Sequence, residues 1–95
     1  MRYDLILQTP LGNRKGMMDV CIENGIVDGV MQLLKCEETF RAKIAPNGQC
    51  SFNGRLVTLM NTIPYNAVGR ITEREVELSL IGDRESFRLT GKPCE

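Results

Sequence analysis

Apolar and polar residues alternate along most of the chain, and short turn sequences interrupt the alternation at regular intervals. No stretch sustains the 3.6-residue apolar repeat of an amphipathic helix. Alternation broken by regular turns is typical of an antiparallel β-meander, sandwich or barrel. The pattern predicts eight strands, near residues 2–8, 15–23, 26–35, 38–45, 49–60, 63–72, 75–82 and 85–91.

The turn sequences predict which residues face each other, because the length of a hairpin loop fixes the register of its strands. Asn24-Gly25 is the strongest two-residue hairpin signal, and it places Ile22 opposite Val27. The other turns are expected to pair Leu33 with Phe40, Ile44 with Cys50, Met60 with Tyr65, Ile71 with Val76 and Leu80 with Phe87. In this register every hairpin keeps its apolar residues on one face, which includes Thr58 and contains no charged residue.

Five glycines fall on the inward face, each opposite a larger residue: Gly16, Gly29, Gly54, Gly69 and Gly91. Glycine inside a strand weakens the strand and usually marks a bend, which a sheet needs if it is to close on itself. The missing side chains either leave room for a ligand or permit curvature and are filled from across the strand. From the sequence alone, both a hollow interior and an interior filled by side chains are compatible with these glycines.

Eight strands joined in sequence order predict one domain over residues 1–95, an up-and-down antiparallel meander closed into a barrel. In architecture the arrangement resembles the lipocalin and avidin barrels. The chain has no tryptophan, so no site residue is carried over from those families. A two-sheet β-sandwich is the alternative.

Composition excludes several functions. Twelve basic residues balance twelve acidic ones, so we expect no general attraction to nucleic acid or to anionic membranes. The chain has no histidine, which removes the usual general base and the commonest zinc ligand. Without an inward-facing carboxylate or a metal-binding cluster, we expect neither an enzyme nor a bound cofactor.

The cysteines are not spaced for zinc, and we expect free thiols in a reducing compartment: Cys21, Cys36, Cys50 and Cys94. The N-terminal residues contain an apolar run of only three, and no window approaches 18 apolar residues. We therefore expect neither a signal peptide nor a membrane span, and predict a cytoplasmic protein.

Two functions remain. The first is a barrel that binds a small apolar or amphipathic molecule, with one end lined by Phe52, Thr58, Met60 and Tyr65. Polar groups in an apolar cavity are typical of such a site. Three outward arginines, Arg41, Arg55 and Arg70, are candidates for an anion contact, because the register sets Arg55 opposite Arg70.

The alternative function is a homo-oligomeric interaction or assembly module with a solid core and no ligand. Apolar residues on the outer face indicate burial against a partner, and a two-fold homodimer is the commonest arrangement. The predicted interface consists of Val57, Leu59, Val68 and Ile81, with Val57 opposite Val68. A second outward apolar group consists of Met17, Ile26, Val30 and Leu34.

Overall fold

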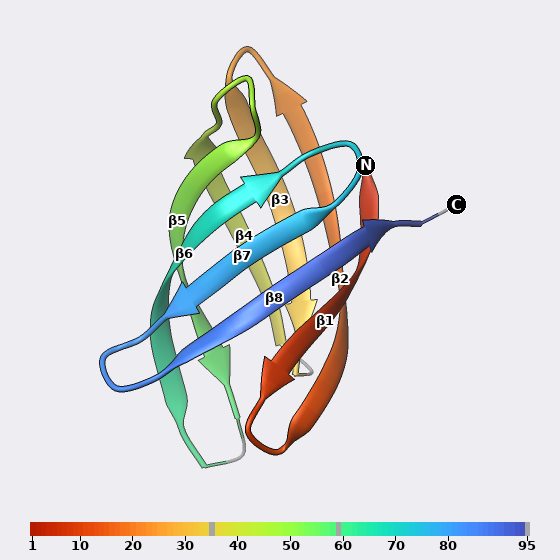
Figure 1. Ribbon diagram of the computed structural model, residues 1–95. Coiled ribbons are helices and arrows are strands. Elements are labelled where there is room, and N and C mark those ends of the chain that lie inside the picture. Colours follow the sequence, from red (N-terminus) through yellow and green to blue (C-terminus); the bar gives the residue numbers. More distant parts are fainter. Residues whose placement is uncertain (35, 59, 95) are drawn as a thin grey trace.

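The computed structural model describes residues 1–34, 36–58 and 60–94, which form one nearly closed, barrel-shaped antiparallel sheet (Figure 1). The eight strands are β1 (Arg2–Thr9), β2 (Gly12–Glu23), β3 (Ile26–Leu33), β4 (Cys36–Lys43), β5 (Gln49–Val57), β6 (Thr62–Ile71), β7 (Val76–Ile81) and β8 (Ser86–Pro93). The predicted all-β fold of eight strands is confirmed. No helix able to cross a membrane occurs in the part of the chain that the structure describes.

The sheet runs in the order β4-β3-β2-β1-β8-β7-β6-β5. The first and last strands pair in its middle, so the two chain ends lie side by side (Figure 1). The outermost strands, β4 and β5, meet on the far side of the barrel. Among the described residues only the isolated bridge between Ile44, directly after β4, and Cys50 of β5 joins them. We call this discontinuity, between residues 36–43 and 49–57, the seam.

One apolar cluster fills the inside of the sheet, and aromatic side chains cover two of the inward glycines. A methyl group on Gly29 would lie 2.6 Å from Cε1 of Phe40, and one on Gly54 would lie 2.5 Å from the Tyr65 hydroxyl. An aromatic ring over a glycine on the neighbouring strand pins the register and permits curvature. At both positions the space left by glycine is occupied from across the strand pair.

The predicted register is right at three hairpins, right only beside the turn at a fourth, and wrong at two. Ile22 faces Val27, Ile71 faces Val76 and Leu80 faces Phe87, as expected. Ile44 also faces Cys50 as expected, but the strands that this turn joins form no ladder beyond that pair in the described residues. Leu33 pairs with Cys36 instead of Phe40, and Tyr65 pairs with Gly54 instead of Met60. Both errors shift a strand by an even number of residues, so the buried and exposed faces are preserved.

The β5–β6 error arises from the turn that joins these strands. Thr58 accepts hydrogen bonds from the backbone N–H of Met60 (3.4 Å) and of Asn61 (3.0 Å), and donates to the Asn61 carbonyl (2.9 Å). The turn therefore begins at Thr58, and Met60 is 93% exposed at its tip. Thr72 makes the same bonds around Glu75, at a turn that was placed correctly. A threonine at the start of a turn is therefore the signal that could have located the β5–β6 turn.

Candidate functional site: the seam between β4 and β5

The β4 side of the seam presents backbone groups without a strand partner. Hydrogen-bonded residue pairs alternate along an antiparallel ladder. The Ile44 N–H donates to the Gly25 carbonyl at 2.9 Å, so the even-numbered residues of β4 bond to β3. The backbone N–H and C=O of Glu37, Thr39 and Arg41 therefore point toward β5.

The β5 side has the same arrangement. The Ile71 N–H donates to the Gly48 carbonyl at 2.9 Å, so the even-numbered residues of β5 bond to β6. The backbone groups of Asn53, Arg55 and Val57 then point toward β4. Within the described ranges no ladder joins these residues to β4, although β4 and β5 are neighbours. Such free edges are able to pair with another strand.

Aromatic rings close the seam from the inside. Phe40 of β4 stacks on Phe52 of β5, with ring centroids 4.1 Å apart and planes 11° apart. Both residues also line a groove of about 620 Å³ on the outside of the seam. Its walls carry Thr39, Arg41, Lys43, Ser51 and Asn53. The groove thus has an aromatic floor between two edges of unpaired backbone.

A second hollow, of about 690 Å³, continues the seam at the end away from the bridge, and Tyr65 and Glu38 both line it. The Tyr65 ring passes over Gly54 toward β4. Burial raises the pKa of Tyr65 to about 12, and the neighbouring Glu38 and Cys36 act in the same direction. The phenol therefore remains neutral at physiological pH.

Glu38 corrects one expectation. It pairs with the buried Met31, so its carboxylate lies on the inward side of β4, where no charged residue was predicted. The error follows from the β3–β4 turn: the predicted turn ends just before Glu38, whereas β4 begins at Cys36 opposite Leu33 and pairs Glu38 with Met31. The side chain is half-buried at the seam.

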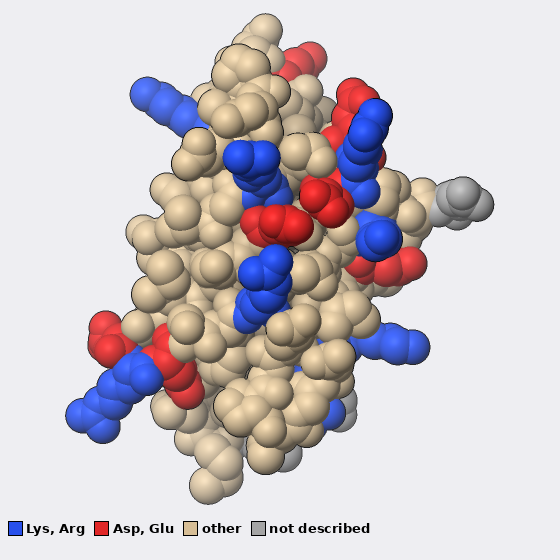
Figure 2. Space-filling model, in the orientation of Figure 1, with Lys and Arg blue, Asp and Glu red and all other residues tan. Residues whose placement is uncertain are grey.

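Charge changes sign along the seam. At the bridged end the described groove lining contains Arg41 and Lys43 and no Asp or Glu. At the opposite end the second hollow is lined by Glu38 of β4 and Arg55 of β5, together with Asp83 from the β7–β8 turn. Elsewhere the surface is mixed: Figure 2 shows basic and acidic side chains interspersed on the face that it displays.

The predicted ligand residues separate into two pairs. Phe52 and Tyr65 are buried at the seam, whereas Thr58 and Met60 lie exposed in the β5–β6 turn. They do not line one cavity end together. Small-molecule binding itself remains a prediction.

The predicted anion site is also divided. Arg55 lies opposite Pro64, and Arg70 lies between Gln49 and Glu77, so the expected apposition of Arg55 and Arg70 is wrong. Arg41 and Arg55 instead belong to the two walls of the seam. Arg41 forms an ion pair with Asp28 at 3.5 Å.

The predicted oligomer interface does not form a continuous patch. Val57 pairs with Thr62 and Val68 pairs with Ser51, so the two valines lie roughly 20 Å apart along the sheet. Ile81 is a diagonal neighbour of Val68, because Val68 faces Ser79. Leu59 lies outside the described residues. Self-association remains a prediction.

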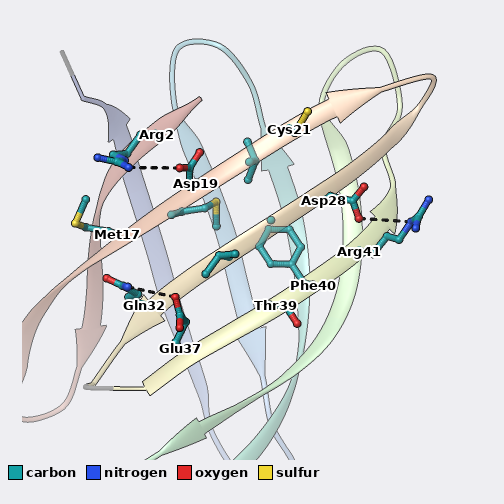
Figure 3. A pocket seen from close by; sticks show the side chains of 14 residues that line it. Arg2, Met17, Asp19, Cys21, Asp28, Gln32, Glu37, Thr39, Phe40 and Arg41 are labelled. Atoms are coloured by element: carbon teal, nitrogen blue, oxygen red, sulfur yellow. Dashed lines mark hydrogen bonds and ion pairs between the residues drawn. The ribbon is translucent and has the colours of Figure 1, made fainter.

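A shallow hollow of about 800 Å³ crosses the outer face of β2, β3 and β4 (Figure 3). Val30 and Met17, from the second apolar group, line it. Its polar rim includes the Arg2–Asp19 ion pair at 3.6 Å and a hydrogen bond from Gln32 to Glu37 at 3.4 Å. Arg2 and Arg41 offset Asp19 and Asp28 in this lining, which leaves Glu37 as one additional negative charge.

The cysteines are free thiols, and no group of three metal-ligating side chains occurs among the described residues. No protein-family model, curated protein or solved structure matches the chain.

Proposed function

We propose that this protein is a non-enzymatic interaction module that binds an extended protein segment along the seam. The observation that carries the proposal is that, in the described residues, β4 and β5 form no ladder and only the isolated Ile44–Cys50 bridge closes one end of the seam. Recognition by strand addition uses backbone hydrogen bonds for affinity and side-chain contacts for specificity. The seam offers backbone groups on both edges and the Phe40–Phe52 stack as an apolar floor.

Packing inside the barrel favours this function over the small-molecule carrier. A carrier needs interior space, and the carrier hypothesis relied mainly on the inward glycines to provide that space. Phe40 occupies the space above Gly29, and Tyr65 occupies the space above Gly54. Native mass spectrometry of gently purified protein tests the carrier directly, since a retained small mass that is lost on denaturation would favour it.

We place the module in the reducing cytoplasm, because Cys21, Cys36, Cys50 and Cys94 are all free thiols.

The binding test removes one seam-facing N–H. Thr39→Pro deletes a donor directed at the seam and leaves the β3 ladder intact, and proline is tolerated in strands where its N–H has no partner. Thr39→Val keeps the N–H and suits a strand. Peptides selected from a library of random ten-residue segments are then measured by fluorescence anisotropy against both variants and the parent.

We expect Thr39→Pro to bind the selected peptides about tenfold more weakly than Thr39→Val, the cost of about one hydrogen bond. Circular dichroism confirms that both variants are folded. Equal affinities would overturn the seam as the binding site. If the library yields no binder, the basic side chains of the seam serve only to protect its edges from aggregation, and the proposed function is wrong.

A further inference from the structure

We propose that the bound segment is the C-terminal end of a polypeptide, with its α-carboxylate at Arg41 and Lys43. This inference rests on the proposed function and specifies the partner of the same seam. It follows from the shape of the seam and from the distribution of charge along it.

The seam is blind at one end. The Ile44–Cys50 bridge joins its two edges there. Just beyond the bridge, the Ala45 N–H donates to the Gln49 carbonyl at 2.9 Å and closes the turn. At the other end no pairing connects Glu37 with Val57 across the seam. An extended segment that enters there and follows the strands must stop at the bridge, which suits a chain terminus.

Charge selects the kind of terminus. The blind end presents Arg41 and Lys43 with no carboxylate in its described lining, so it attracts an α-carboxylate and repels an α-ammonium. The Arg41–Asp28 pair does not occupy Arg41 fully, since both side chains are more than half exposed, at 73% and 58%. An exposed pair of this kind exchanges readily with water or a competing anion.

The direction of the segment follows from the position of its carboxylate. A chain that runs from the open end to the bridge is antiparallel to β5 and parallel to β4. Antiparallel pairing is the more stable per residue, so the stronger ladder forms with Asn53, Arg55 and Val57. A second, parallel ladder forms with Glu37, Thr39 and Arg41, and this is the edge that Thr39→Pro tests. Alternate side chains of the segment then face the Phe40–Phe52 stack, which favours apolar residues at those positions.

The test uses two libraries of the same random ten-residue segments. In the first the segment ends in a free carboxylate, and in the second it is followed by a fixed Gly-Ser tail. We expect binders from the first library only. The best binder is then synthesised as the free acid and as the C-terminal amide, and its affinity is measured for the parent, Lys43→Gln and Lys15→Gln.

We expect the amide to bind the parent about tenfold more weakly than the acid, the usual magnitude for a charge-assisted hydrogen bond. Lys43→Gln should reduce binding of the acid and leave binding of the amide unchanged. Lys15 is exposed on β2, away from the seam, so Lys15→Gln controls for the loss of one positive charge.

Each outcome decides a different claim. Binders from both libraries that are sensitive to Thr39→Pro would overturn the C-terminal inference and leave the seam as a strand-addition site. An acid and an amide of equal affinity would also overturn the inference. Failure of both libraries would overturn the proposed function itself.

Discussion

Phe40 stacks on Phe52 at a centroid distance of 4.1 Å, although the backbones of β4 and β5 form no ladder at this point. The barrel is therefore closed here by side chains, whereas backbone hydrogen bonds join all seven other pairs of adjacent strands. Ring contacts place no constraint on the backbone donors and acceptors above them. The rings thus cover the seam on the inside of the barrel, while the backbone N–H and C=O groups of its edges remain available for hydrogen bonds on the outside.

Amide hydrogen exchange should alternate along the seam. The N–H groups of Thr39 and Arg41 point toward the seam, and we expect them to exchange within minutes. The N–H groups of Phe40 and Ala42 are bonded to β3, and we expect exchange at least about tenfold slower. Exchange measured residue by residue by NMR checks this, and uniform protection along β4 would show that a ladder closes the seam in solution.

Gly29→Ala should destabilise the fold. The new methyl group would lie 2.9 Å from Cγ1 of Val20 as well as against the Phe40 ring, so we expect a loss of about 1–3 kcal/mol in urea unfolding. Replacing Phe40 by Leu in the same chain removes the ring atoms that clash. The double variant should lose less than the sum of the two single losses. Simple additivity would mean that the ring is not what fills the glycine site.

Tyr65 makes stability sensitive to alkali. Burial raises its pKa to about 12, whereas an unfolded tyrosine ionises near pH 10. As pH rises the unfolded state loses this proton first. The contribution of the neutral phenol is therefore complete below pH 10 and is lost between pH 10 and pH 12. Urea unfolding at pH 9 and pH 11 should show a smaller loss for Tyr65→Phe than for the parent, and equal losses would contradict this account.

Because Val57 and Val68 lie far apart, substitutions at the two positions test different parts of the predicted oligomer interface. If the chain forms a dimer through the β6–β7 face, Val68→Asp should give monomers by sedimentation at tens of micromolar. Val57→Asp, roughly 20 Å away, should leave that dimer intact. A parent chain that sediments as a monomer would remove the predicted interface altogether.

Much of the fold could be predicted because side chains alternate between the two faces along each strand, so the apolar alternation identifies the buried face. The Asn24-Gly25 turn was found from its residues, and both have the positive φ that this turn needs, 52° and 75°. The β3–β4 turn was missed because Leu34 takes φ of 52°, which its residue type does not signal. A slip by an even number of residues leaves the apolar pattern intact, so alternation could not expose the error.

The candidate site was less predictable for the same reason. Phe52 and Tyr65 were identified from their inward positions. The predicted register extended β5 to Met60 and so placed Met60 in the interior. In the structure β5 ends at Val57 and the turn begins at Thr58, so Met60 lies outside the strand. The seam itself depends on where a ladder stops, and the sequence of β4 and β5 contains no proline or other signal at that point.

The strand order also determines how the chain can fold. The strands form two meanders, β1–β4 and β5–β8, in which every ladder joins neighbours in sequence. In the described part of the chain the β1–β8 ladder alone connects the meanders, and it pairs residues as distant as Tyr3 and Pro93. Because pairing residues so distant in sequence is entropically costly, we expect docking of the two meanders to be the slow step of folding. The β1–β8 ladder would then form last, after the ladders within each meander.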